Sequence, residues 1–135
     1  MKYYVVIDTN VLVSAMLRCN SIPGNIMELV FDGSIIPLVS QEIIDEYRKV
    51  LSRPKFQLEQ SIIDDVIVSI EENAVYVDAK KLNIEIPDPK DRIFYEIVME
   101  KRKQDDAYLV TGNSKHFPTE PFILTPREFL NMVLE

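Results

Sequence analysis

Residues 3–10 of this chain read Tyr-Tyr-Val-Val-Ile-Asp-Thr-Asn, a continuous aromatic and β-branched run that ends in a polar turn. Such a run is typical of a strand that is buried on both faces of a parallel sheet. From residue 11 onward the apolar residues take a helical spacing, so the turn lies at a strand-to-helix junction. The stretch therefore predicts an α/β unit with Asp8 at the carboxyl end of its first strand.

Strands and helices are predicted to alternate along the rest of the chain. Further strands are expected at residues 34–39, 75–77, 107–110 and 123–124, and helices are expected to start near residues 24, 40, 61, 88 and 125. Pro37 favours an edge position or a strand end, and Ser61 with Asp64 resembles a capping box. Strands that alternate with helices across short links are typical of a parallel sheet covered on both faces. We expect one domain over residues 1–135, an α/β, three-layer α/β/α sandwich with a central, mainly parallel sheet.

The composition excludes several kinds of chemistry. One cysteine, Cys19, cannot form an internal disulfide, which is usual in the reducing cytoplasm. Three scattered glycines do not make a phosphate-binding loop, and one histidine, His116, does not make a usual zinc site. The apolar run that ends at Asp8 is too short for a membrane span of about 20 residues. Any metal is therefore expected to be held by oxygen, in a cytoplasmic protein with no membrane partner.

The 15 basic and 22 acidic residues leave a formal net charge of −7, which repels nucleic acid at long range. A nucleic-acid partner would therefore need a local source of positive charge on the protein. The run Lys101-Arg102-Lys103 is one candidate, but its place at a helix C-terminus is explained better by the helix dipole and by solubility. A cation bound among carboxylates is the other candidate.

Ligands of open parallel sheets bind beyond the carboxyl ends of the strands. Acidic residues at those ends are therefore the candidates for a binding site. Asp8 and Asn113 follow strands, whereas Asp105 and Asp106 precede one and are expected in a solvated turn.

Helix geometry selects two more acids. Glu46 lies about 100° from the apolar face of its helix, and Asp91 about 90° from that of the next, so both border buried stripes. Glu42 and Asp45 are expected to face water. Asp8, Glu46 and Asp91 thus come from three elements that can meet at one edge of the sheet.

Carboxylates that meet in this way are either partly protonated or occupied by a cation, because like charges within about 4–6 Å raise one another's pKa. Oxygen ligands select Mg²⁺ or Mn²⁺, and such ions serve phosphoryl transfer without a protein nucleophile.

Plain structural roles remain open for each candidate. Asp8 can act only as the cap of the following helix, and Glu46 can pair with a lysine three residues on. Asp91 can be the reciprocal half of a capping box with Asp88, and Asn113 can be a turn residue. His116 is interpreted as a loop residue outside the site.

At these residues the chain resembles the PIN-domain family, in particular the VapC-like toxins of toxin–antitoxin pairs. The matching motifs are Val5–Ser14, Ser40–Glu46, Asp88–Asp91, Leu109–Asn113 and Leu124–Leu130. The resemblance implies a Mg²⁺- or Mn²⁺-dependent ribonuclease with Asp8, Glu46 and Asp91 as acidic ligands. It further implies Thr9 and Asn10 in a supporting shell, an antitoxin partner and, in many relatives, a homodimer.

One departure from the family pattern affects the number of metal ions. Asn113 stands where many PIN domains carry a fourth acid, so the amide oxygen can still coordinate but one negative charge is lost. One or two metals both remain open.

The leading hypothesis is a metal-dependent endoribonuclease that cleaves RNA as the toxin of a toxin–antitoxin pair. In it, Asn113 positions water or metal, and Thr9, Asn10 and Thr111 orient the carboxylates, with Asp88 as a supporting neighbour. Two alternatives are a PIN-like module that binds RNA or protein without cutting, and a metal-dependent phosphatase of small phosphoesters.

Overall fold

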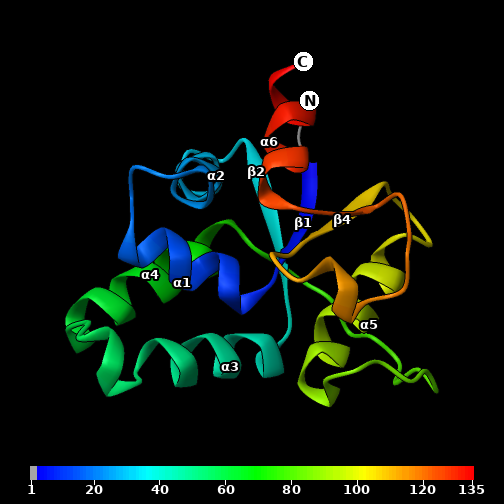
Figure 1. The fold of residues 1–135 in the computed structure, drawn as a ribbon, viewed down its shortest axis with the longest axis horizontal. Coiled ribbons are helices and arrows are strands. Elements are labelled where there is room, and N and C mark those ends of the chain that lie inside the picture. The colour runs from blue at the N-terminus through cyan, green and yellow to red at the C-terminus, as the bar shows by residue number, and fades with distance from the viewer. Residues whose placement is uncertain (1–2) are drawn as a thin grey trace.

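A computed structural model describes residues 3–135, and their central sheet is parallel throughout (Figure 1). Its five strands follow the order β3-β2-β1-β4-β5. They are β1 (Tyr3–Ile7), β2 (Ile35–Val39), β3 (Val75–Tyr76), β4 (Ala107–Val110) and β5 (Ile123–Leu124). The predicted three-layer α/β/α architecture is confirmed, because helices cover both faces of this sheet.

The helices lie in two layers around the strands. In Figure 1, α1 (Thr9–Leu17) and α2 (Ile22–Phe31) lie on one side of β1, and α5 (Arg92–Lys101) lies on the other. The remaining helices are α3 (Gln41–Leu51), α4 (Gln60–Asn73) and α6 (Pro126–Leu134), with 3₁₀ turns at Pro54–Phe56, Pro89–Asp91 and Ser114–His116. Within residues 3–135 we find no helix with the length and apolar character that a bilayer crossing requires.

Pro37 does not place its strand at the sheet edge, contrary to the sequence prediction. β2 is an inner strand that pairs with β1 and β3, and Pro37 lies opposite Val5. The carbonyl of Val39 accepts a hydrogen bond from Val77 on the β3 side, so the nitrogen of Pro37 faces that side too, because backbone groups alternate. β3 begins only opposite Leu38, so the missing N–H of Pro37 has no strand to pair with.

The predicted capping box at Ser61 is also wrong. Helix α4 begins at Gln60, and its cap residue Glu59 makes no side-chain cap bond. The carbonyl of Glu59 accepts from the backbone N–H groups of Ile62 and Ile63, so the first turn is already formed at Ser61. Two other predicted caps are confirmed: Ser40 caps α3, and Thr125 caps α6 with a complete capping box.

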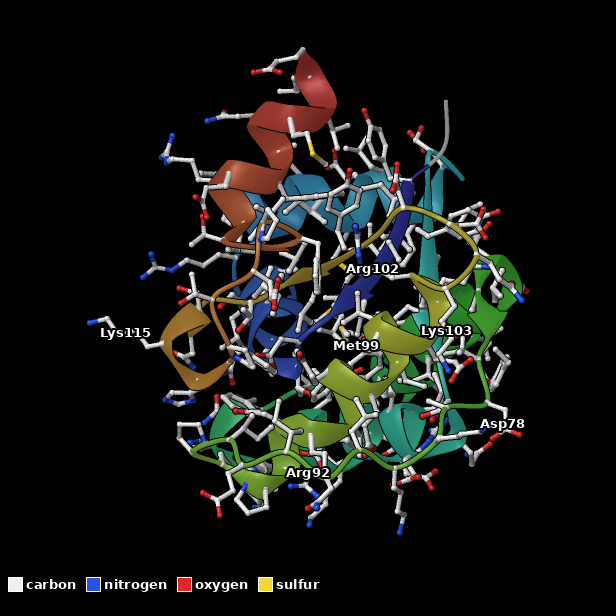
Figure 2. The ribbon with its side chains drawn as sticks, turned by 90° about the vertical axis from the view of Figure 1, so that its right-hand side faces the viewer. Asp78, Arg92, Met99, Arg102, Lys103 and Lys115 are labelled. Carbon is white, nitrogen blue, oxygen red and sulfur yellow. The ribbon has the colours of Figure 1, made fainter. Side chains whose placement is uncertain are left out.

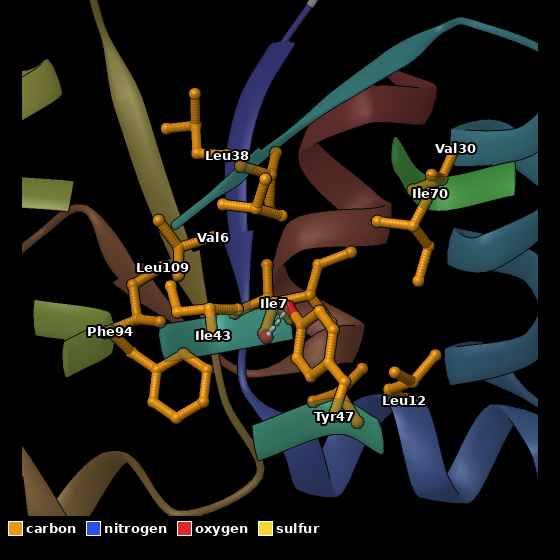
Figure 3. Close-up of a cluster of buried hydrophobic side chains, with 14 of the residues drawn as sticks. Val6, Ile7, Leu12, Val30, Leu38, Ile43, Tyr47, Ile70, Phe94 and Leu109 are labelled. Atoms are coloured by element: carbon orange, nitrogen blue, oxygen red, sulfur yellow. Dashed lines mark hydrogen bonds between the residues drawn. The ribbon is translucent and has the colours of Figure 1, made fainter. Parts of the chain in front are cut away.

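The apolar face of α3 packs into the core as its spacing predicts. Ile43 and Tyr47 lie among side chains from the strands and from Phe94 of α5 (Figure 3). The rings of Tyr47 and Phe94 stack with their centroids 6.4 Å apart. The Tyr47 hydroxyl donates a hydrogen bond of 2.5 Å to the carbonyl oxygen of Ile7. This bond fixes the end of β1 immediately before Asp8.

Candidate functional site

Asp8 lies where the sheet reverses its strand order. β1 has β2 on one side and β4 on the other, which makes its carboxyl end the switch point at which open α/β sheets bind ligands. The backbone N–H of Asp8 donates to the carbonyl of Val110, a 3.0 Å bond that continues the β1–β4 ladder. The residue is only 3% exposed.

The Asp8 carboxylate is both a helix cap and part of a cavity wall. Its Oδ2 accepts a 2.6 Å hydrogen bond from the Thr111 hydroxyl, and its Oδ1 accepts a 3.4 Å bond from the N–H of Asn10 in the first turn of α1. Burial raises the pKa of this carboxyl, although the hydrogen bonds from Thr111 and from the backbone of Thr9 and Asn10 work against that rise. Asp8 therefore caps α1, and it still lines the cavity, so the cap does not exclude a role in a binding site.

The three acids selected from the sequence line one cavity of about 180 Å³. Asp8 enters it from the end of β1, Glu46 from α3, and Asp91 from the 3₁₀ turn that precedes α5. The wall of this cavity is also lined by four further residues that were selected from the sequence: Thr9, Asn10, Asp88 and Asn113. Glu42, Asp45, Asp105 and Asp106 are all exposed, as expected for acids outside the site.

Asp91 shows the electrostatic consequence of this arrangement. Burial and the negative charge of Asp8 raise the pKa of Asp91 to about 6 from 3.8, and Asp88 adds to the rise. The imidazole of His116, whose Nδ1 lies 3.4 Å from Asp91 Oδ2, works in the opposite direction. Within residues 3–135 no lysine or arginine forms an ion pair with Asp91, so its repulsion by Asp8 is not cancelled by such a pair.

Two of the plain structural roles are absent. In the described part of the chain Glu46 forms no ion pair with Lys49, and it lies half-buried at the cavity. The reciprocal capping bond from Asp91 is also missing, because Asp88 accepts from the N–H of Lys90 and Asp91 makes no side-chain cap bond.

Thr111 supports the site from outside the cavity. Its side chain is fully buried, and its hydroxyl donates to Asp8 while it accepts a 3.0 Å bond from the N–H of Asn113. One hydroxyl thus connects the carboxylate at the end of β1 to the loop after β4. This loop places Asn113 at the cavity wall.

Three cavity residues with ionisable side chains were not selected from the sequence. His116 was interpreted as a loop residue outside the site; it lies in a short turn, and the structure places it on the cavity wall beside Asp91. Arg53 and Lys90 line the same cavity. His116 follows Asn113 by three residues and ends the 3₁₀ turn Ser114–His116. Such a short turn has no periodicity that could have identified it from the sequence.

The donor set of the cavity suits a hard divalent cation. Its acids offer oxygen ligands, and the hydroxyl of Thr9, which also lines the wall, is buried without a hydrogen-bond partner. Among residues 3–135, however, no three Asp, Glu, His or Cys side chains lie close enough together to hold an ion as they stand. The oxygen donors of the cavity therefore suit a hard cation in chemistry, although their present spacing forms no group of three such ligands among residues 3–135.

Two comparisons with known proteins bear on this site. A family model described as PIN domain matches residues 4–115, a span that contains every acid named above. An uncharacterized protein of Methanocaldococcus jannaschii is 41% identical over 56 residues, which are 42% of this chain and 36% of that protein. The chain thus spans little more than a third of the length of this curated relative.

Proposed function

The chain belongs to the PIN-domain family, whose fold is of the nuclease type, and on that premise we propose that it is a metal-dependent endoribonuclease. One observation carries the proposal. Asp8, Glu46 and Asp91, which lie far apart in the sequence, line one cavity at the switch point of the sheet. A cavity that holds several acids is tolerable at neutral pH when a cation occupies it.

Mg²⁺ or Mn²⁺ would be held by Asp8, Glu46 and Asp91. When bound, the cation supplies Lewis-acid stabilisation of negative charge on the phosphate and lowers the pKa of a water. The hydrogen bond from Thr111 orients Asp8 and works against the rise that burial causes in its pKa, and Asn10 holds the other carboxylate oxygen. Asn113 presents an uncharged amide at the cavity wall, where it can accept or donate a hydrogen bond without adding charge.

The chain also offers a group for the proton that hydrolysis releases. His116 lines the cavity, and its Nδ1 lies 3.4 Å from Asp91 Oδ2. Its imidazole can accept that proton, whereas Asp91, as a ligand of the cation, would stay ionised.

Cleavage of single-stranded RNA tests the proposal. The wild-type protein is expected to cut RNA in Mg²⁺ or Mn²⁺ and not in EDTA, and Asp8→Asn is expected to lose at least about a hundredfold in rate. Asp106→Asn, an exposed carboxylate outside the cavity, serves as the matched control. Equal activity in wild type and Asp8→Asn would reject the proposal.

A non-cutting module for RNA or protein is the second candidate function. It is favoured by the amide of Asn113 and by the absence, among residues 3–135, of three side chains at ion-holding distance. Titration calorimetry with Mn²⁺ separates the two, because micromolar binding that is lost in Asp8→Asn contradicts an inert module.

The toxin role extends the same proposal. We propose a cytoplasmic toxin neutralised by an antitoxin protein, with a homodimer as the assembled form and residues 1–135 as one domain. Expression of the wild-type chain should arrest growth and Asp8→Asn should not, while co-expression of the protein encoded by an adjacent small gene should restore growth. Unimpaired growth with active enzyme would exclude the toxin role and leave the nuclease intact.

A further inference from the structure

The basic run at residues 101–103 is engaged inside the protein. The Lys101 ammonium lies 4.5 Å from the centre of the Tyr4 ring and 3.1 Å from Asp105 Oδ2. The Arg102 guanidinium lies 4.2 Å from the centre of the Phe122 ring and donates to a backbone carbonyl. Lys103 pairs with Glu100 at 3.1 Å. These contacts leave the run poorly suited to bind phosphates.

The same run also lies at the wrong end of its helix. Figure 2 shows Arg102 and Lys103 at one end of α5 and Arg92 at the other, which is the end that follows the acidic turn. Ten residues at about 1.5 Å each separate the two ends by roughly 15 Å. Phosphate contacts near the acids must therefore come from other cations.

Arg53 and Lys90 are the two such cations on the cavity wall. Both are exposed, and in residues 3–135 neither forms an ion pair, although four acids line the same cavity. They come from different elements: Arg53 follows the end of α3, and Lys90 lies in the 3₁₀ turn Pro89–Asp91. Two unpaired cations beside an acidic cavity are available to a ligand that carries negative charge.

The spacing along α3 separates Arg53 from the acids. Glu46, Val50 and Arg53 line the cavity at intervals of four and three residues, so they follow one face of the helix and of the turn that ends it. At about 1.5 Å per residue, Arg53 lies on the order of 10 Å beyond Glu46 along the axis. Arg53 thus lies on the cavity wall beyond Glu46, and within residues 3–135 it forms no ion pair with the acids of the cavity.

We propose that Arg53 and Lys90 bind backbone phosphates of a single-stranded nucleic acid that flank the phosphate held over the acids. This inference rests on the proposed function, because it names the substrate class and the binding contacts of the same site. Asp8 is only 3% exposed at the base of a cavity of about 180 Å³, so the reacting phosphate has to enter the molecule. A flexible single strand can bend a phosphate inward, whereas bending a duplex is costly.

Salt-dependent binding gives the decisive measurement. A labelled single-stranded RNA is titrated with protein in EDTA, so that no cleavage interferes, and fluorescence anisotropy is followed from 0.05 to 0.5 M salt. Each lost phosphate contact reduces the slope of log K against log salt by about 0.7 for a single strand, which is about fivefold weaker binding at 0.1 M salt. We expect this change for Arg53→Gln and for Lys90→Gln, and about twice this change for the double variant.

Matched controls exclude a general effect of charge. Arg127→Gln and Lys81→Gln each remove one exposed cation outside the cavity and should leave the slope unchanged. Unfolding midpoints of all variants should equal that of the wild type, because both target side chains are exposed.

The outcomes separate this inference from the nuclease proposal. Unchanged slopes for Arg53→Gln and Lys90→Gln, or no RNA binding at all, overturn it even if the wild type cleaves RNA. Reduced slopes support it even if no cleavage is found, in which case the nuclease proposal alone fails. Binding of an acidic peptide through the same pair, without RNA binding, also overturns it.

Discussion

Replacement of Asp91 by asparagine should stabilise the metal-free protein at neutral pH while it removes a proposed metal ligand. The reason is that the folded chain partly buries this carboxyl and keeps it close to the negative charge of Asp8, so it ionises less readily than in the unfolded chain. Asparagine has nearly the same shape and carries no charge. The variant therefore removes both the cost of burying a charge and the repulsion by Asp8.

The magnitude follows from the pKa of Asp91. Burial and neighbouring charge raise this pKa from 3.8 to about 6. At about 1.4 kcal/mol for each tenfold change in proton affinity, the upper bound is about 3 kcal/mol. The side chain keeps 15% of its exposure, so solvent screening reduces the expected effect to about 1–2 kcal/mol.

The sign of the pH dependence follows from proton binding. Between about pH 4 and pH 6 the folded protein retains a proton on Asp91 that the unfolded chain has released. This proton lowers the free energy of the folded state, so the free energy of unfolding falls as pH rises through that window and stays low above it. In Asp91→Asn this contribution is missing.

Urea unfolding in EDTA between pH 4 and pH 7.5 measures the difference. The gain in stability of Asp91→Asn over wild type should grow by about 1–2 kcal/mol between pH 4 and pH 6.5 and then level off. Mn²⁺ at saturating concentration should reverse the order, because it stabilises only the protein that binds it. Asp106→Asn is the control.

Two results would refute the reasoning. One is an Asp91→Asn protein that is less stable than wild type at pH 7.5 in EDTA. The other is a stability difference that does not change with pH, because it would mean that burial and the charge of Asp8 do not raise the pKa of Asp91 in solution.

Substitutions at three further buried residues test the hydrogen bonds that their side chains make. Thr111→Val should lower the free energy of unfolding by about 1.5–3 kcal/mol and Mn²⁺ affinity by about 10–100-fold, because Asp8 loses its 2.6 Å donor; urea unfolding and calorimetry measure both. Tyr47→Phe should cost about 0.5–1.5 kcal/mol in urea unfolding, since the carbonyl before Asp8 loses its buried donor, and an unchanged midpoint would contradict this. Glu96→Ala should speed hydrogen exchange at the Leu82 amide, which donates to the Glu96 carboxylate at 2.7 Å, whereas Glu96→Gln should retain protection; equal exchange in both variants would refute that anchor.

Local patterns in the sequence predicted most of the secondary structure. The run at residues 3–7, the apolar face of α3 and the cap at Thr125 each depend on neighbours within one or two turns or within one strand. The failed prediction for Pro37 needed the register of β3, which starts 38 residues later in the chain. The failed cap at Ser61 needed the true start of α4.

The site was predictable only in part. Asp8 was selected from its place at a strand end, and Glu46 from its angle on an amphipathic helix. Asp91 was selected from an angle on a helix expected to start near residue 88, whereas the structure places it in the 3₁₀ turn before α5. His116, Arg53 and Lys90 gave no such signal, because each lies in a turn without periodicity. Their common place on the cavity wall appeared only once the chain was folded.

The sequence alone therefore determined the kind of elements and which acids lie at strand and helix ends, because both depend on short-range spacing. Its composition, with one histidine and one cysteine, excluded a metal site rich in nitrogen and sulfur. Tertiary structure alone decided that β1 lies between β2 and β4, and so brought Asp8, Asp91 and His116 to one cavity. Strand order is set by long-range packing of buried side chains, which no local pattern encodes. The raised pKa of Asp91 arises from this packing, because it needs both the burial and the charge of a residue 83 positions away.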